Sequence, residues 1–122
     1  MEIKGYEQLI VWQKAMDLTV EIYRIVKLLP KEELYALSDQ MRRAAVSIPS
    51  NIAEGQSRNS TKEFVQFLNI AAGSNAELFT HLLICERVGY VSKQELNTAK
   101  SLSGEVARII SSILSKLNSS IK

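Results

Sequence analysis

The feature that most constrains the fold is a proline inside a segment with helical periodicity. Apolar side chains recur there at three- and four-residue steps, which places them on one face of a helix; they are Leu34, Leu37, Met41, Ala44, Ile48 and Ile52. The pattern keeps its phase through Pro49. An interior proline removes one N–H and crowds the carbonyl four residues earlier, that of Ala45, at a cost of about 3 kcal/mol. We therefore predict one helix from about Lys31 to Gly55, kinked at Pro49 and held by tertiary packing, with Ser47 or Ser50 as a hydroxyl partner for the freed carbonyl.

Three further segments have the same periodicity. The first is expected from about Tyr6 to Leu29. The third begins at the capping box Ser60-Thr-Lys-Glu63 and ends before Gly89, a suitable left-handed C-cap, and the fourth begins at the capping box Ser92-Lys-Gln-Glu95. No period-two alternation and no hairpin turn signal occurs. The sequence therefore predicts an all-α, antiparallel up-down-up-down four-helix bundle that forms a single domain over residues 1–122.

The first helix has an apolar face wider than one bundle seam requires. A core stripe is expected at Val11, Ala15, Leu18, Ile22, Ile25 and Leu29, and a second stripe lies beside it at Trp12, Met16, Thr19, Tyr23 and Val26. On a small monomer this second stripe would be a large exposed apolar patch. We therefore expect a homo-oligomer with Trp12, Met16, Tyr23 and Val26 at or near its interface.

The composition is that of an ordinary small globular protein. Among 122 residues, 15 are Lys or Arg and 13 are Asp or Glu, so the net charge of +2 is too small to indicate nucleic-acid binding by itself. Cys85 is the single cysteine, so no intrachain disulfide can form and a cytoplasmic location is expected. No signal peptide and no apolar run long enough to span a membrane is recognised, so no membrane association is expected.

Few residues suggest catalysis. A di-iron bundle needs paired Glu-x-x-His motifs, whereas Glu77 precedes the single histidine, His81, by four residues. Cys85 falls on the apolar stripe of the third helix, where an inert core thiol is expected. We predict no catalytic residues, no metal, no cofactor and no small-molecule substrate; an enzyme that uses Glu77 and His81 is the alternative.

A polar stripe repeats along the second helix at Gln40, Arg43, Ser47, Asn51 and Glu54. It is either a solvated face or a structural network between helices or subunits. If the second and third helices are antiparallel and joined at residues 56–60, Gln40 lies opposite Glu77. On the network reading we predict a substantially buried pair of Arg43 with Glu77 or, failing that, with Glu54.

Cations at Arg42, Arg43, Arg58 and Lys62 could contact phosphate groups. No aromatic side chains are interleaved with them, and the alternative is a mixed surface in which they pair with neighbouring carboxylates. Arg42, Arg58 and Lys62 are the candidate RNA- or DNA-binding residues.

Several stretches resemble one known family. They are Tyr6-Glu-Gln-Leu-Ile-Val-Trp12, Leu29-Pro-Lys-Glu-Glu-Leu-Tyr35, Gln40-Met-Arg-Arg-Ala-Ala-Val-Ser-Ile-Pro-Ser-Asn-Ile-Ala-Glu-Gly55 and Phe64-Val-Gln-Phe-Leu-Asn-Ile-Ala-Ala-Gly-Ser74. They look like the four-helix-bundle proteins encoded by ribosomal-RNA intervening sequences. The resemblance covers nearly the whole chain, although the fourth helix matches only in pattern. The motif residues carried over are Trp12, Gln40, Arg42, Arg43, Ser47, Pro49, Asn51, Glu54 and Gly55.

The resemblance implies a left-handed bundle that assembles as a homopentamer. It also implies kinship with the accessory protein of diversity-generating retroelements, a basic pentameric barrel that associates with a reverse transcriptase and nucleic acid. We therefore expect a non-enzymatic, homo-oligomeric, pentameric scaffold that binds a protein or nucleic-acid partner: RNA, DNA or a nucleic-acid enzyme. The alternatives are a purely structural protein-interaction module without nucleic-acid binding, or the enzyme described above.

Overall fold

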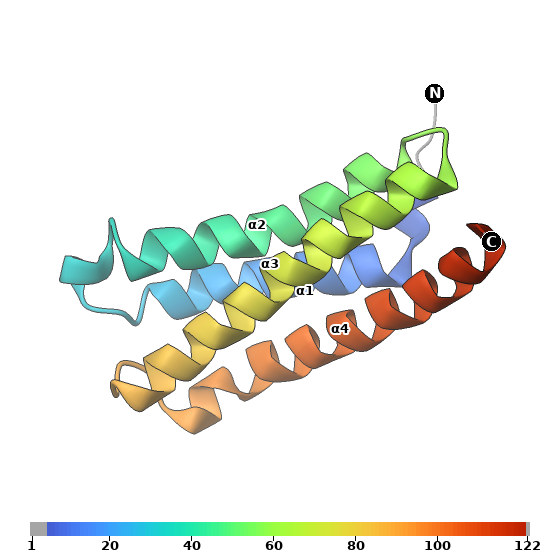
Figure 1. The fold of residues 1–122 in the computed structure, drawn as a ribbon. Helices are drawn as coiled ribbons and strands as arrows, with labels where there is room; N and C mark the ends of the chain where they lie inside the picture. Colours follow the sequence, from blue (N-terminus) through green and yellow to red (C-terminus); the bar gives the residue numbers. More distant parts are fainter. Residues whose placement is uncertain (1–4, 122) are drawn as a thin grey trace.

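The computed structural model describes residues 5–121, and within that range the regular secondary structure consists of helices joined by turns, with no strand. Four α-helices form a bundle, which confirms the predicted all-α fold (Figure 1). The elements are a 3-10 helix at Gly5–Gln8, α1 at Ile10–Val26, a 3-10 helix at Lys31–Glu33, α2 at Leu37–Gln56, α3 at Thr61–Arg87 and α4 at Lys93–Ile121.

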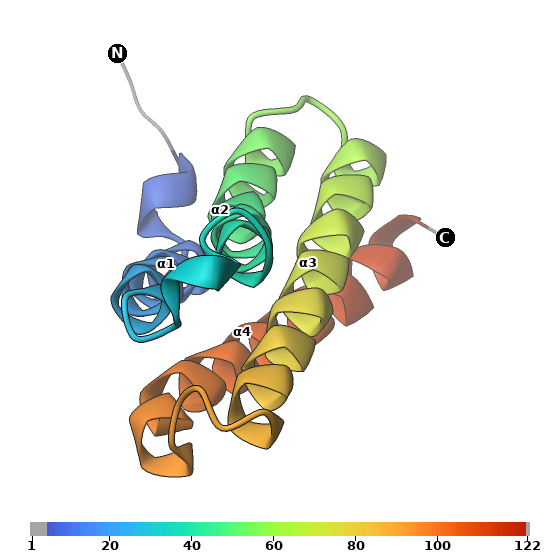
Figure 2. The same cartoon turned by 90° about the vertical axis from the view of Figure 1, so that its left-hand side faces the viewer.

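Each helix packs against two others. α1 contacts α2 and α4, α3 contacts α2 and α4, and the pairs α1–α3 and α2–α4 are diagonal (Figure 2). Lys14 near the start of α1 pairs with Glu105 of α4, whereas Arg24 near the end of α1 bonds the carbonyl of Glu95. Residue numbers in α4 therefore fall as those in α1 rise, so these two helices run in opposite directions.

The second helix begins later than expected. Residues 31–33 form a separate 3-10 turn, Ala36 has φ −124° and ψ −102°, and α2 starts at Leu37 rather than at Lys31. The non-helical backbone at Ala36 breaks the helical phase, so Leu34 is 44% exposed and does not extend the core stripe. The extended conformation of Pro30, with ψ 153°, similarly separates α1 from this turn.

The helix α2 runs through Pro49 to Gln56, with Pro49 buried. The freed carbonyl of Ala45 accepts a hydrogen bond from neither neighbouring serine. It lies 3.1 Å from the hydroxyl of Thr19 on α1, which is also 2.8 Å from the carbonyl of Ala15 in its own helix. The prediction of a local serine partner was wrong because a side chain of the packed helix reaches that carbonyl from outside.

The core stripes of all four α-helices fill the centre of the bundle. The largest fully buried side chains are Leu18, Ile22, Ile25, Met41, Ile48, Ile52, Leu68, Leu78, Leu82, Leu96, Ile110 and Val11. Two of the four buried polar residues of the described chain, Asn75 and Ser103, bond each other. Asn75 of α3 donates to the carbonyl of Ser103 at 3.0 Å, and the Ser103 hydroxyl donates to Oδ1 of Asn75 at 2.9 Å. This reciprocal pair gives each side chain a partner and sets the register of α3 against α4.

The two ends of α3 have the capping residues that the sequence predicts. Ser60 accepts from the N–H of Glu63 at 3.0 Å and starts α3. At the other end of α3, Gly89 has φ +84°, its N–H bonds the carbonyl of Glu86, and Tyr90 N–H bonds that of Cys85, which is a Schellman motif.

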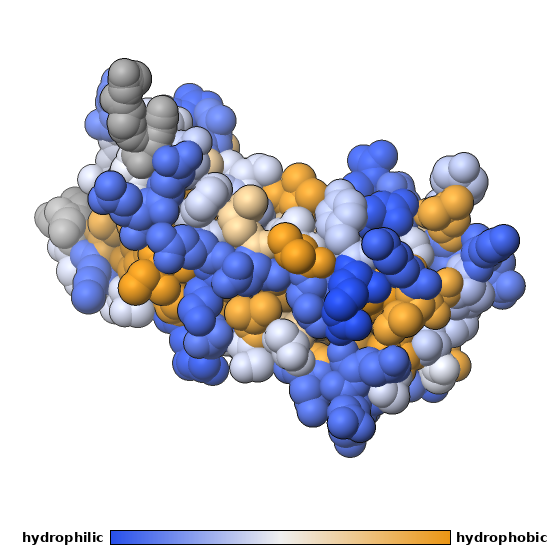
Figure 3. Space-filling model, turned by 180° about the vertical axis from the view of Figure 1, so that it is seen from behind, coloured by the Kyte–Doolittle hydropathy of each residue, from blue (hydrophilic) through white to orange (hydrophobic). Residues whose placement is uncertain are grey.

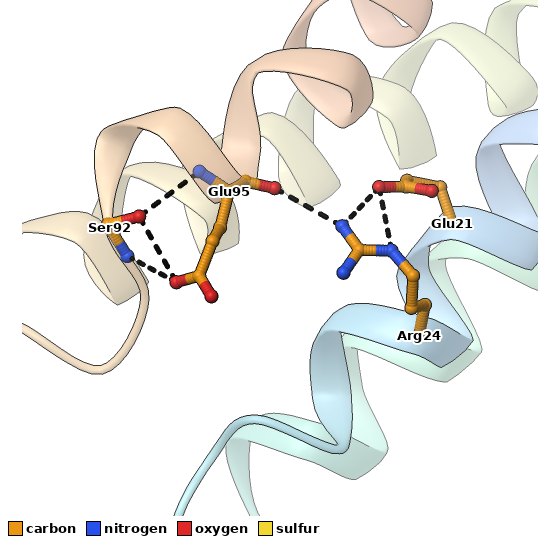
Figure 4. A network of polar contacts seen from close by, with 4 residues as sticks. All are labelled: Glu21, Arg24, Ser92 and Glu95. Atoms are coloured by element: carbon orange, nitrogen blue, oxygen red, sulfur yellow. Dashed lines mark hydrogen bonds and ion pairs between the residues drawn. The ribbon is translucent and has the colours of Figure 1, made fainter.

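The start of α4 is also capped. Ser92 and Glu95 bond each other's backbone N–H groups at 3.1 Å, so the second predicted capping box is present in both directions (Figure 4). In the same view Arg24 of α1 bridges Glu21 and the carbonyl of Glu95. The cap of α4 is therefore tied to α1.

Candidate interaction surfaces

A hollow of about 350 Å³ runs between α1 and α2, and we call it the α1–α2 groove. Its lining is Tyr6, Trp12, Met16, Thr19, Val46, Pro49, Ser50 and Ala53. Tyr6 and Trp12 meet edge to face with ring centroids 5.5 Å apart, which fixes the orientation of the indole at one end. Met16 and Val46 are about two-fifths exposed, so apolar side chains of both helices are open to solvent here.

The four residues expected at an oligomer interface are divided by the structure. Trp12 and Met16 line the α1–α2 groove, and the exposed Tyr23 lines the adjacent depression with Arg42, Arg43 and Val46. Val26 is half-buried and, like Trp12, packs against the core. Figure 3 views the molecule from behind and shows hydrophobic side chains in several patches separated by polar ones.

The sequence reasoning missed a second apolar surface. Ile70 and Ile84 are exposed on α3 and Val88 is exposed at its C-cap, and with Glu77 they form what we call the outer face of α3. Ile70, Glu77 and Ile84 follow at seven-residue intervals, so they lie on one side of the helix. Apolar residues outside the core stripe of α3 were the signal that could have revealed it.

Part of the predicted polar network exists. Asn51 donates to the carbonyl and the hydroxyl of Ser47 at 2.8 and 2.9 Å, and the hydroxyls of Ser47 and Ser74 are 2.8 Å apart. These half-buried groups link α2 to α3, and Ser74 was not predicted. Gln40 is exposed.

The predicted buried pair of Arg43 was wrong. Arg43 bonds Asp39 on the same helix at 3.0 Å, and its side chain is 79% exposed. Glu54 is likewise paired with Arg58, four residues later, at 2.7 Å. A side chain four residues away on the same helix lies close enough to form an ion pair. The expected pairing across helices assumed a register of α2 against α3 that differs from the observed one, in which Ser47 contacts Ser74.

Glu77 and His81 come together without forming a catalytic arrangement. The Nε2 atom of His81 lies 3.6 Å from a Glu77 oxygen, which is longer than a hydrogen bond. Nδ1 is buried and has no partner. Burial lowers the pKa of His81, and Glu77 only partly opposes this. The imidazole is therefore neutral at pH 7, and its ring is 6% exposed, which hinders contact with a substrate.

The thiol of Cys85 is a core group. It lies 3.7 Å from the sulfur of Met41, and burial raises its pKa to about 11. A protonated buried thiol is neither a good nucleophile nor a metal ligand. Across residues 5–121, no three His, Cys, Asp or Glu side chains are arranged to hold a metal ion.

The three candidate nucleic-acid contacts do not form one patch. Arg58 pairs with Glu54 and stacks 5.1 Å from the centre of the Phe67 ring. Arg42 lies 3.8 Å from Asp39 and bonds the carbonyl of Leu34. Sixteen residues separate it from Arg58, or about 24 Å along a helix axis. Lys62, in the first turn of α3, is exposed. Only Arg58 and Lys62 share one end of the bundle.

The chain was compared with known proteins. The model of a family described as 23S rRNA-intervening sequence protein matches residues 7–112. A crystal structure from Bacteroides thetaiotaomicron VPI-5482, described as a protein of unknown function from the S23 ribosomal protein family, superposes with a TM-score of 0.80. The two chains are 26% identical, and the match covers 86% of this chain and 98% of the other. No curated protein matches. Within residues 5–121 no helix has the length and apolar character to cross a membrane.

Proposed function

We propose that this chain, which belongs to the family of 23S rRNA-intervening sequence proteins, is a homo-oligomeric scaffold without enzymatic activity. The observation that carries the proposal is the open α1–α2 groove. Its indole, thioether and proline side chains lie beside Tyr23, and aromatic residues and Met are enriched at protein interfaces. The resemblance of the sequence to pentameric bundles makes five subunits the expected number.

Several charged groups of the described residues are engaged in contacts within the bundle rather than in a catalytic arrangement. Glu86 is held by Lys100 and Lys93, Arg24 by Glu21, and Tyr90 donates to Glu33 at 2.7 Å. The pairs of Glu86 join α3 to α4 and the bond of Tyr90 joins two loops, whereas the pair of Arg24 lies within α1. The one histidine is buried, with a neutral ring whose Nδ1 has no partner. This arrangement offers no accessible general base beside a nucleophile, which enzymatic acyl or phosphoryl transfer requires.

Binding of RNA or DNA is the second candidate. The observation that favours it is Lys62, exposed and in the first helical turn after Arg58. A symmetric ring repeats such cations around its axis, so a small patch becomes a continuous one. Because Arg58 shares its charge with Glu54, each subunit contributes less than two full charges.

Light scattering at micromolar concentration tests the scaffold proposal. We expect a mass several times 13.7 kDa for the wild type and a large loss of assembly for Met16→Glu. Leu28→Glu is the matched control, because Leu28 is 42% exposed against 40% for Met16 but lies in the turn after α1. A monomeric wild type would refute the proposal, and equal assembly of the two variants would remove the groove from the interface.

A further inference from the structure

A hollow of about 360 Å³ also lies between α3 and α4, and we call it the α3–α4 groove. This volume is within the range of small-molecule sites. Most of its walls are apolar, formed by Phe79 and by the small residues Ala72, Ala76, Gly104 and Ala107. The α3–α4 groove shares no residue with the α1–α2 groove, so it is separate from the surface that carries the proposed function.

Small side chains keep the groove open to solvent. Ala72, Ala76 and Phe79 follow one another at four- and three-residue steps, so they lie on one side of α3. Ala76 is exposed and Phe79 is half-buried, so a ring that enters the groove has an aromatic side chain to pack against. Seven residues separate Ala72 from Phe79, or about 10 Å along the helix, which is the length of a bicyclic ring with a short chain.

One buried polar side chain of the groove has an unused donor. Asn75 lines the groove and is 3% exposed. Its Nδ2 atom carries two N–H groups, and one of them donates to the carbonyl of Ser103 at 3.0 Å. Within residues 5–121 no group accepts the other. A buried donor without an acceptor is costly, so an acceptor atom of a ligand is favoured at this position.

A cation lies at the edge of the same groove. The Nη1 atom of Arg108 is 3.4 Å from the position that a Cβ atom on Gly104 would take, so the guanidinium lies beside Gly104. Among the described residues the Arg108 side chain has neither an ion pair nor a hydrogen bond. Glu105, three residues earlier, pairs instead with Lys14 of α1 at 3.5 Å.

These two donors are near each other in the fold. Gly104 directly follows Ser103, the hydrogen-bond partner of Asn75, so Arg108 and Asn75 approach the groove at the same level of α4. A single unpaired guanidinium balances one negative charge, which matches a carboxylate better than a phosphate dianion.

We propose that the α3–α4 groove binds a small carboxylic acid that carries an aromatic ring. The carboxylate accepts the second N–H of Asn75 and pairs with Arg108, while the ring packs on Phe79 over the alanine side chains. No small-molecule substrate is expected from the sequence, because the groove depends on how α3 and α4 pack. The inference goes beyond the scaffold and does not depend on the number of subunits.

Binding of indolepropionate to the wild-type protein tests the proposal. Saturation-transfer NMR detects the contact of the ring, and isothermal titration calorimetry gives the Kd, which we expect to be millimolar or lower. Indolepropionamide keeps the ring but has no charge, so it should bind about tenfold more weakly. No binding of the acid at millimolar concentration, or equal binding of acid and amide, would overturn the carboxylate site.

Two substitutions with matched controls locate the ligand. Arg108→Gln should weaken binding of the acid about threefold to fivefold and leave the amide unchanged, whereas Arg43→Gln, on α2, should change neither. Ala76→Leu fills the groove and should abolish binding of both compounds. Gln66→Leu adds an apolar side chain at an exposed position of α3 outside the groove and should bind as the wild type does. Circular dichroism melts check that all four variants fold, and wild-type binding by Ala76→Leu would overturn the assigned groove.

A dipeptide distinguishes a free acid from a segment of a protein. Acetyl-Trp-Glu amide carries an indole and a carboxylate on a peptide backbone, whose additional amide groups would have few partners along the apolar walls. We therefore expect it to bind more weakly than indolepropionate. Tighter binding of the dipeptide would overturn the assignment to a small acid and indicate a protein segment. A monomeric wild type would refute the proposed scaffold without affecting any of these binding results.

Discussion

Replacing Thr19 by valine is predicted to destabilise the fold because of a proline on another helix. Pro49 has no N–H to donate to the carbonyl of Ala45, and the Thr19 hydroxyl lies 3.1 Å from that oxygen. Valine keeps the shape and the β-branching of threonine but cannot donate. In the half-buried site the carbonyl would then lack a partner.

The magnitude follows from the cost of an unsatisfied buried acceptor, about 1–3 kcal/mol. Because the site is only part-buried, water offsets some of the loss, and we expect about 1–1.5 kcal/mol. Thr19 also contacts the carbonyl of Ala15, but that carbonyl belongs to the ordinary hydrogen-bond ladder of α1 and keeps its own partner.

A double-mutant cycle separates this cause from packing. In a Pro49→Ala background, alanine supplies an N–H to the carbonyl of Ala45, so Thr19→Val should cost about 0.5 kcal/mol or less. Urea unfolding followed by circular dichroism gives the four free energies, at one protein concentration because assembly contributes to stability. An equal cost of Thr19→Val in both backgrounds would show that the hydroxyl does not substitute for the missing N–H.

Three further results are expected. Burial lowers the pKa of His81, so the stability that its neutral ring contributes is complete above the unfolded pKa of about 6.5 and is lost as pH falls below that value. Urea unfolding at pH 7.5 and at pH 5.5 measures this loss. His81→Leu should lose less stability than the wild type when the pH is lowered from 7.5 to 5.5. Gly55→Ala should destabilise the fold by about 1–2 kcal/mol in thermal melts, because its Cβ would lie 2.7 and 2.9 Å from atoms of two phenylalanines on α3. Gly104→Ala is the control: its Cβ would meet only the end of a flexible arginine, so this variant should be as stable as the wild type or more stable. If RNA binds, Arg58→Ala with Lys62→Ala should weaken a fluorescence-anisotropy titration at low salt and reduce its salt dependence; binding unchanged by the two substitutions would exclude this end of the bundle.

The sequence predicted the fold well where local chemistry decides it. The apolar stripes, the capping box of Ser92 with Glu95, and Gly89 at positive φ are all recognisable from short-range patterns. The start of α2 was misplaced because the apolar spacing continues through Ala36, whereas the backbone does not.

Contacts between helices were harder to predict. Thr19 with Ala45, Ser47 with Ser74, and Asn75 with Ser103 each depend on the register of two packed helices, which loop lengths alone do not set to within one residue. The error at Arg43 has the same origin. Asp39, four residues earlier, was a local competitor that the stripe pattern ignored. The outer face of α3 was missed because the core stripe of that helix was taken as its whole apolar content.

The native mass of the wild-type chain tests the central claim most directly. Sedimentation velocity over a range of micromolar concentrations should give one species several times the 13.7 kDa chain mass, five times for the expected pentamer, without a dimer as end point. A ring of identical subunits is built from one heterologous contact that repeats from copy to copy and closes. A chain that stays monomeric at all concentrations would contradict the scaffold, and one that stops at a dimer would contradict the expected pentamer.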